Sequence, residues 1–296
     1  GLGGSGNNSN NTAVGKDALL SITTGASNVV LGSIAGDSIT SQSYCILIGS
    51  NAGGAITSDD ANGLIAIGHG AGTANTSGQK NMFIGYSAGG ENTIGDNNVA
   101  IGYGAMDDTL GGLQNDDNVA IGVNAMGGTW VSTASSDNIA IGTGSMTGDM
   151  NSAYENTAVG VKALEDLTTG HRNCAFGKHS LKGVTANASG EGNVGLGFAA
   201  GGVITTGDRN VVIGSAALDS SHTATSSVVV IGCRAADAIT TTAADGTVAI
   251  GDSALGALTS GAGNVAVGYQ ALDAEDEGSG STAIGYTALS AQNNDT

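Results

Sequence analysis

A short motif that recurs along almost the whole chain is the feature that most limits how this protein can fold. The segment NTAVGKDAL at residues 11–19 returns as NVAIGYGAM at 98–106, as NTAVGVKAL at 156–164 and as NVAVGYQAL at 264–272. A unit this short cannot bury a core alone, so the copies must stack on one another. Sixteen copies align on the glycines Gly15, Gly32, Gly49, Gly68, Gly85, Gly102, Gly122, Gly142, Gly160, Gly177, Gly197, Gly214, Gly232, Gly251, Gly268 and Gly285.

Each copy repeats the same residue types around its glycine. The residue before the glycine is apolar in every copy, as at Ile101, Ile121 and Ile141, and the residue three positions after it is Ala in fourteen copies and Ser in two. β-Branched residues in front of a glycine are typical of a short strand that ends in a turn. We therefore predict about four strand residues, a glycine turn, a second short segment and a T-T-G turn in each unit.

Glycine and asparagine hold places in the repeat that a stacked fold explains. The glycine suits a corner where φ is positive or where two backbones approach too closely for a Cβ atom. Asparagine opens eleven copies, where its side chain can sit in a turn or bond the equivalent asparagine of the next copy. We predict structural roles for both, represented by Gly15, Gly102, Gly122, Gly160, Gly268, Asn98 and Asn118.

The apolar positions of one unit are few. In the unit around Gly160 we expect Val159, Ala163, Leu164 and Leu167 to form the core. This is a thin core for a free-standing coil of chain, and association of three chains would bury one face of each. The sequence therefore favours a homotrimer, and a single-chain β-solenoid with about 18 residues per turn is the alternative.

Composition separates the classes of function. The chain has 8 Lys and Arg against 26 Asp and Glu, a formal charge of −18, and no proline. Nucleic-acid binding needs clustered Lys and Arg, so we expect no nucleic-acid partner. The apolar runs, such as residues 228–231, are far shorter than the ~20 residues that cross a bilayer, so we expect no membrane insertion. The chain opens at Gly1 without an initiator methionine, which predicts a segment or processed form of a longer protein.

The repeat N-x-A-[IV]-G-x-x-A-L resembles the head repeats of YadA-like trimeric autotransporter adhesins, and it is similar to repeats of bacteriophage tail-fibre proteins. The likeness covers residues 11 to about 290, which makes 1–10 a lead-in, 11–290 one repeat domain and 291–296 a tail. It implies an all-β fold of about sixteen coils, a solenoid or left-handed β-roll, in an intertwined or side-by-side homotrimeric fibre. Even the shortest units, such as the one from Gly15 to Gly32, are longer than that family's usual repeat, and no neck, stalk or anchor domain is visible.

The resemblance also implies a function. It suggests an extracellular fibre that projects from a surface and attaches to a glycan or protein of a host cell. A phage tail fibre on the virion surface is the first expectation, and the head of a bacterial surface adhesin is the alternative. The four histidines fall at different phases of the repeat and pair with no carboxylate in a recurring pattern, so we predict neither enzymatic activity nor a cofactor.

Paired acids in the longer units suggest a possible metal site. Paired acids occur at Asp107–Asp108, Asp116–Asp117 and Asp59–Asp60, and carboxylates crowded on stacked turns would favour a hard cation such as calcium. The alternative is that these acids form solvated loops without a metal.

Two further features raise questions of binding. Trp130 is the only tryptophan and lies in one of the longest units, between Gly122 and Gly142. An exposed indole could stack on a receptor sugar, and the alternative is that it fills the space under the longer loop. Threonine doublets such as Thr23–Thr24 raise ice binding as a lower alternative, although they do not occur in every copy.

Overall fold

The computed structural model describes residues 9–58, 61–109, 112–130, 132–184, 190–219, 224–241 and 244–291. These ranges contain sixteen strands, and the chain divides into two compact units, Gly1–Ser152 and Ala153–Thr296. The first unit holds β1 (Thr12–Val14), β2 (Val29–Leu31), β3 (Ile46–Ile48), β4 (Ile65–Ile67), β5 (Met82–Ile84), β6 (Val99–Ile101), β7 (Val119–Ile121) and β8 (Ile139–Ile141). The second unit holds β9 (Thr157–Val159), β10 (Cys174–Phe176), β11 (Val194–Leu196), β12 (Val211–Ile213), β13 (Val229–Ile231), β14 (Val248–Ile250), β15 (Val265–Val267) and β16 (Thr282–Ile284).

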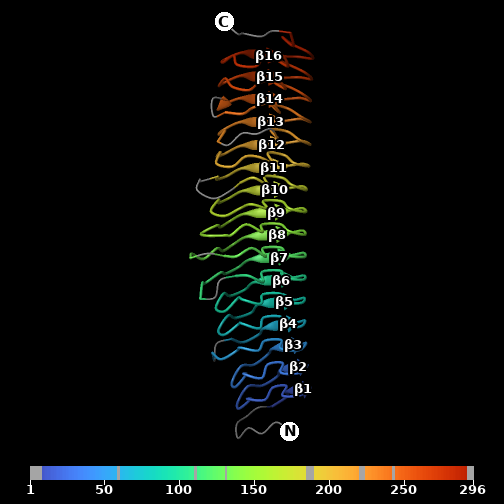
Figure 1. The fold of residues 1–296 in the computed structure, drawn as a ribbon, viewed down its shortest axis with the longest axis vertical. Coiled ribbons are helices and arrows are strands. Elements are labelled where there is room, and N and C mark those ends of the chain that lie inside the picture. The colour runs from blue at the N-terminus through green and yellow to red at the C-terminus, as the bar shows by residue number, and fades with distance from the viewer. Residues whose placement is uncertain are drawn as a thin grey trace. The chain divides into compact units, whose positions relative to one another are not determined.

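Within each unit the strands pair in chain order, and every pair is parallel. Val99 pairs with Val119, and Val119 pairs with Ile139, so equivalent repeat positions form columns. Figure 1 shows this stacking of one coil on the next in both units. The predicted all-β solenoid is therefore confirmed, with strands that are each one residue shorter than expected.

Side chains alternate along each strand, so the middle residue points into the coil and its two neighbours point outward. Ala120 is fully buried, whereas Ile121 beside it is half-buried. Val159 and Ile101 are likewise half-buried, and Ile141 is exposed. The prediction that the residue before the glycine fills the core, made for Val159, is therefore wrong, because the two-residue period of a strand turns that position outward.

The rest of the predicted core lies inside. Ala163, Leu164 and Leu167 are fully buried, as expected from the repeat. The equivalent alanines at the two ends of the repeat, Ala18 and Ala288, are only half-buried, because each has a neighbouring coil on one side only. Burial at this position therefore depends on stacking, as the shortness of the unit requires.

Large and small side chains compensate for one another inside the coils. Phe83 occupies the middle of β5, where most coils have Ala, and glycine replaces the usual Leu or Met at Gly72 and Gly89. A Cβ atom on Gly72 would lie 2.8 Å from the Phe83 ring, and one on Gly89 would lie 2.5 Å from it. The reverse occurs in β11, where a Cβ atom on Gly195 would lie 2.7 Å from Cγ of Leu181. The interior thus keeps its volume while its sequence varies.

The glycine that ends each strand is required twice over. Gly122 has a φ of +137°, and a Cβ atom placed on it would lie 2.7 Å from the carbonyl oxygen of Gly142 in the next coil. The other representative glycines share this backbone, with φ of +141° at Gly15, +140° at Gly102, +141° at Gly160 and +139° at Gly268. Both predicted reasons, positive φ and close approach of backbones, hold at this corner.

Left-handed backbone also occurs at residues other than glycine, which the sequence did not predict. Lys162 has a φ of +58° and Leu164 a φ of +48°, two and four positions after Gly160, and the same two positions recur in other coils. Such a conformation costs roughly 1–2 kcal/mol at a residue with a Cβ atom. Pairing between coils offsets this cost, since the backbone N–H of Leu164 donates to the carbonyl oxygen of Ser180 at 3.1 Å.

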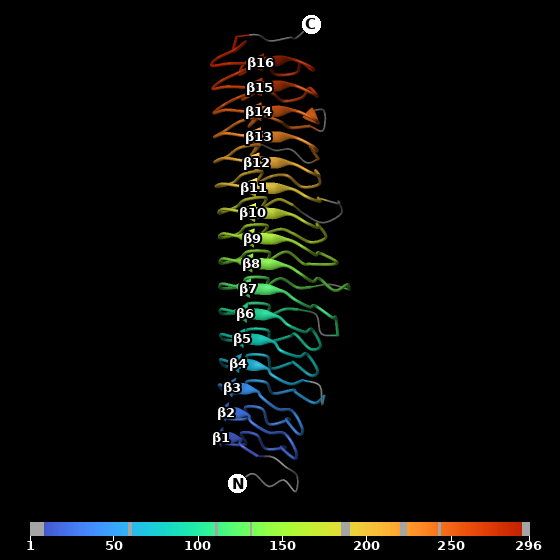
Figure 2. The ribbon, with the colours of Figure 1, turned by 180° about the vertical axis from the view of Figure 1, so that it is seen from behind.

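Each coil has two different edges. We call the side with the short turn after each strand the turn edge, and the side with the loop that leads into the next strand the loop edge. Figure 2 shows that the loops on the loop edge project further than the turns within each unit. Among the residues that the structure describes, none belongs to a helix long and apolar enough to cross a membrane.

Candidate functional site

The first and third residues of the strands form an outward-facing surface, which we call the outer strand face. Its positions are apolar except for a threonine at Thr12, Thr157 and Thr282, and each is half-buried or exposed. A contiguous exposed apolar surface of this kind marks an interaction site. In the first unit it comprises Thr12, Val29, Ile46, Ile65, Met82, Val99, Val119 and Ile139 beside Val14, Leu31, Ile48, Ile67, Ile84, Ile101, Ile121 and Ile141. In the second it comprises Thr157, Cys174, Val194, Val211, Val229, Val248, Val265 and Thr282 beside Val159, Phe176, Leu196, Ile213, Ile231, Ile250, Val267 and Ile284.

Aromatic rings adjoin this face at the residue after the glycine. His69, Tyr86 and Tyr103 occupy this position in consecutive coils and stack, with ring centroids 5.0 and 5.3 Å apart. In the second unit, Tyr269 and Tyr286 stack in the same way at 5.2 Å. Because the rings stack on one another, they present their edges to solvent. They widen the apolar surface toward the turn edge.

A ladder of buried asparagines runs along the other end of the strands. The Asn98 side chain accepts the backbone N–H of Asn118 at 3.0 Å, and the Asn118 side chain accepts the backbone N–H of Asn138 at 3.1 Å. The Nδ2 groups of Asn98 and Asn118 donate to the carbonyl oxygens of Asn115 and Ser135 at 2.6 and 3.0 Å. These side chains are therefore saturated by the backbone, and their chemistry is structural.

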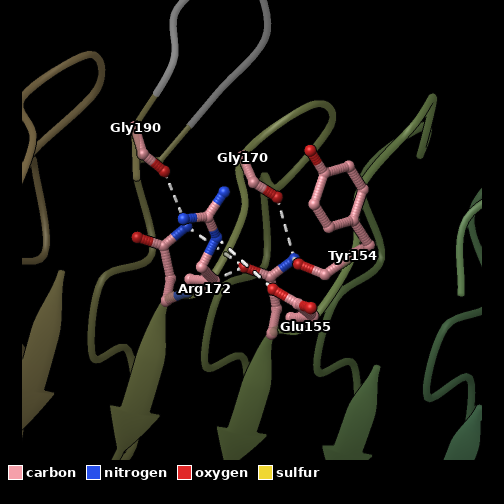
Figure 3. A network of polar contacts seen from close by, with 7 residues as sticks. Tyr154, Glu155, Gly170, Arg172 and Gly190 are labelled. Atoms are coloured by element: carbon pink, nitrogen blue, oxygen red, sulfur yellow. Dashed lines mark hydrogen bonds and ion pairs between the residues drawn. The ribbon is translucent and has the colours of Figure 1, made fainter. Parts of the chain in front are cut away.

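Figure 3 shows the same bonds in the second unit, where carbonyl oxygens of Gly170 and Gly190 accept from the asparagines at 2.8 and 2.7 Å. Beside them, Nε of Arg172 lies 3.3 Å from Oε2 of Glu155. The Tyr154 ring stacks on His171, with ring centroids 3.6 Å apart, and burial lowers the pKa of this histidine. One charged pair and one aromatic pair thus link neighbouring coils on the loop edge.

A second polar ladder on the loop edge accounts for one of the predicted metal ligands. Oδ1 of Asp116 accepts the backbone N–H of Asp96 at 2.8 Å, and the hydroxyl of Ser136 accepts the backbone N–H of Asp116 at 3.1 Å. The neighbouring Asp117 adopts a left-handed φ of +57°. The sequence analysis missed this ladder because its members vary among Asp, Asn and Ser from coil to coil.

The other predicted metal ligands do not belong to this ladder. Burial raises the pKa of Asp107, and the negative charges of Glu91 and Asp108 raise it further. Oδ2 of Asp108 accepts the hydroxyl of Thr129 at 2.7 Å. No three acidic, histidine or cysteine side chains in the described part of the chain form a group able to hold a metal ion. The pair Asp59–Asp60 lies outside the described residues.

Of the two interpretations of Trp130, the structure supports packing and contradicts an exposed indole. The Trp130 side chain is completely buried, and its indole N–H donates to the carbonyl oxygen of Met126 at 3.3 Å. Trp130 is therefore a packing residue in this fold, and a receptor cannot reach it without unfolding the loop.

These features define a class of protein, a parallel β-solenoid whose coils are locked by asparagine ladders and which presents an apolar strand face to its surroundings. Comparison of the chain with profiles of known protein families, with curated proteins and with solved structures found no match.

Proposed function

We propose that this protein is a non-enzymatic structural segment of an extracellular fibre, and that it self-associates as a homotrimer through the outer strand face. The observation that carries the proposal is the apolar surface along each unit. A contiguous apolar surface of this kind is normally covered by a binding partner. A second copy of the same chain fits this surface best, because the columns of apolar side chains on the two copies repeat with the same spacing.

The energies support association. Covering the exposed part of a Val or Ile contributes on the order of 0.5–1 kcal/mol, a fraction of the value for full burial. Sixteen strand positions in each unit then give on the order of 10 kcal/mol per unit, which is comparable with the cost of association. The outer strand face of each unit therefore supplies enough apolar surface to support self-association.

The resemblance of the repeat supports the biological setting. The segment projects a host-binding structure or contributes contacts to a glycan or protein of a host surface. A phage tail fibre is the proposal that we favour, and the head of a bacterial trimeric adhesin is the second candidate. The ladders give each unit stiffness, while the turn and loop edges vary in sequence and carry the contact chemistry.

The solution mass of the 28.5 kDa chain tests the assembly. Light scattering should give the mass of three chains for the natural protein, both with calcium and after addition of a chelator. Ile121→Lys, in the outer strand face, should lower the mass without unfolding the coil, because its side chain points outward. Gln114→Lys is the matched control, since it adds the same charge at an exposed position on the loop edge. A single-chain mass for the natural protein, or equal masses for the two variants, would contradict the proposal.

A further inference from the structure

Positive charge is concentrated at one place on the turn edge of the second unit. Three of the eight Lys and Arg residues of this acidic chain, Lys162, Lys178 and Lys182, lie after the glycines of two consecutive coils. The two coils are stacked, since the backbone N–H of His179 donates to the carbonyl oxygen of Val161 at 3.1 Å. The three ammonium groups therefore share one small surface.

Carboxylates order this surface without neutralising it. Nζ of Lys162 lies 2.7 Å from Oε1 of Glu165, and Nζ of Lys182 lies 3.1 Å from Oε2 of the same carboxylate. Asp166 is half-buried, and burial raises its pKa. Lys178 is exposed and makes no ion pair with any described residue. One carboxylate thus positions two lysines, and a third lysine stays available.

His179 lies in the positive field of these lysines. Burial lowers its pKa most, the charges of Lys178 and Lys182 lower it further, and Glu165 opposes them. Its Nδ1 atom is buried and has no hydrogen-bond partner among the described residues. The surface around this ring is therefore a place where an anion gains energy, although the chain as a whole repels anions.

An exposed aromatic ring adjoins the lysines in the next coil. Phe198 packs edge-to-face against His179, with ring centroids 6.3 Å apart, and 54% of the phenylalanine is exposed. The backbone N–H of Ala199 donates to the carbonyl oxygen of Lys178 at 2.9 Å, so Phe198 and Lys178 lie at the same repeat position of adjacent coils. Unlike the stacked tyrosines, Phe198 does not lie in a column of parallel rings.

We infer that this surface, formed by Lys162, Lys178, Lys182, His179 and Phe198, binds an acidic carbohydrate. The ammonium groups would pair with a carboxylate or sulfate on the sugar, and Phe198 would contact the apolar face of a sugar ring. A long polyanion such as nucleic acid fits less well, because Glu165 and Asp166 limit the positive footprint and the net charge is −18. The inference rests on the attachment part of the proposed function and deepens it by naming the chemical class of the receptor.

Calorimetric titration of the full chain tests this inference with a sulfated oligosaccharide, a uronic acid oligosaccharide and neutral dextran. We expect binding of one or both acidic sugars and none of dextran. Lys178→Ala and Phe198→Ala should each weaken binding by roughly fivefold or more, as loss of a charge-assisted contact or a ring contact predicts. Lys16→Ala, at the repeat position of Lys178 in another coil, and Tyr44→Ala, at an exposed aromatic ring of the first unit, are the controls and should change little. All four side chains are exposed, so thermal melts should show intact folds.

The outcomes are distinct. Absence of binding at about 1 mM of both acidic sugars, or equal weakening by Lys16→Ala, would overturn the inference. The inference would also be overturned if Phe198→Ala bound the sugars unchanged and free sulfate competed as well as the sulfated sugar. The surface would then bind any small anion, without recognising the sugar ring. Light scattering of the same samples separates this result from the assembly, because a single chain that still binds the sugar contradicts the trimer and not the site.

Discussion

The side-chain carbonyl of Asn98 accepts the backbone N–H of Asn118, one coil later in the chain, at 3.0 Å. The equivalent asparagines pair in the same way in neighbouring coils. The backbone N–H of each donates to the side-chain oxygen of the asparagine in the preceding coil, and its own side-chain oxygen accepts from the next coil. A residue type that usually marks turns is here a fully buried link between coils. The stability of the fold therefore depends on polar side chains as well as on apolar ones.

Loss of one link should be costly. Asn118→Ala removes two buried hydrogen bonds, one from the backbone N–H of Asn138 and one to the carbonyl oxygen of Ser135. Loss of each buried bond costs about 1–3 kcal/mol, so we expect a loss of about 2–5 kcal/mol in the free energy of unfolding. Urea unfolding checks this, with Gln114→Ala on the exposed loop edge as the control. Equal midpoints for the two variants would show that the ladder contributes little.

A buried asparagine outside the ladder should have the opposite effect. Asn92 is buried seven positions after its glycine, where other coils have Ile39 or Ile56, and neither polar atom of its amide has a partner among the described residues. Burial of an unpaired amide costs about 1–3 kcal/mol. Asn92→Leu should therefore raise the midpoint of thermal unfolding, whereas Asn98→Leu, the same change in the ladder, should lower it. A lower midpoint for Asn92→Leu would mean that the amide is satisfied in solution.

The need for glycine at the strand end can be tested by comparing Gly122 with Gly263, which also has a positive φ but no close neighbour. Gly122→Ala places a Cβ atom 2.7 Å from the Gly142 carbonyl oxygen, so the two coils must separate there. Gly263 has a φ of +68° with nothing within 4 Å of a Cβ atom, so Gly263→Ala carries only the backbone cost. We expect a loss of about 1 kcal/mol for Gly263→Ala and of more than about 3 kcal/mol for Gly122→Ala. Chemical unfolding of both variants measures the difference, and equal losses would exclude close approach as the reason for the glycine.

One carboxyl group makes the second unit sensitive to pH. Burial, followed by the charge of Asp237, raises the pKa of Asp219 from 3.8 to about 6. Because the folded chain binds this proton more tightly than the unfolded chain, Asp219 stabilises the fold progressively as pH falls from about 6 to about 4. Asp219→Asn should therefore raise the unfolding midpoint at pH 7 and change it much less at pH 4. Midpoints that shift equally at both values would exclude titration of Asp219 as the cause.

The repeat was enough to predict the fold, because a short period with an apolar residue before each glycine admits few other arrangements. The direction of the strand side chains was predicted wrongly, since strands this short do not display their alternation in sequence. Ala120 looks unremarkable beside Ile121, yet the alanine is the core residue and the isoleucine faces outward. The two interpretations of Trp130 could not be separated for a similar reason, because a single large residue in a loop carries no period that would distinguish packing from exposure.

The candidate site was harder to predict than the fold. Lys162, Lys178 and Lys182 are spread over two units of the repeat, and only the stacking of two coils brings them together. The acidic ladder through Asp116 resembled a metal site because carboxylates that accept backbone N–H groups and carboxylates that bind a cation are identical in sequence. Contacts between coils, rather than residue types, decide between these roles.

The Phe83 ring fills the space that side chains at Gly72 and Gly89 would need, and this pairing of large and small residues also affects which coils stack on one another during folding. A chain made of near-identical copies could slip by one whole copy and recover most of its backbone bonds. After such a slip the phenylalanine would meet a neighbour that already carries a large side chain, and a void would open where the glycines then stood. The irregular copies thus favour the correct alignment of the coils over alignments that are shifted by one copy.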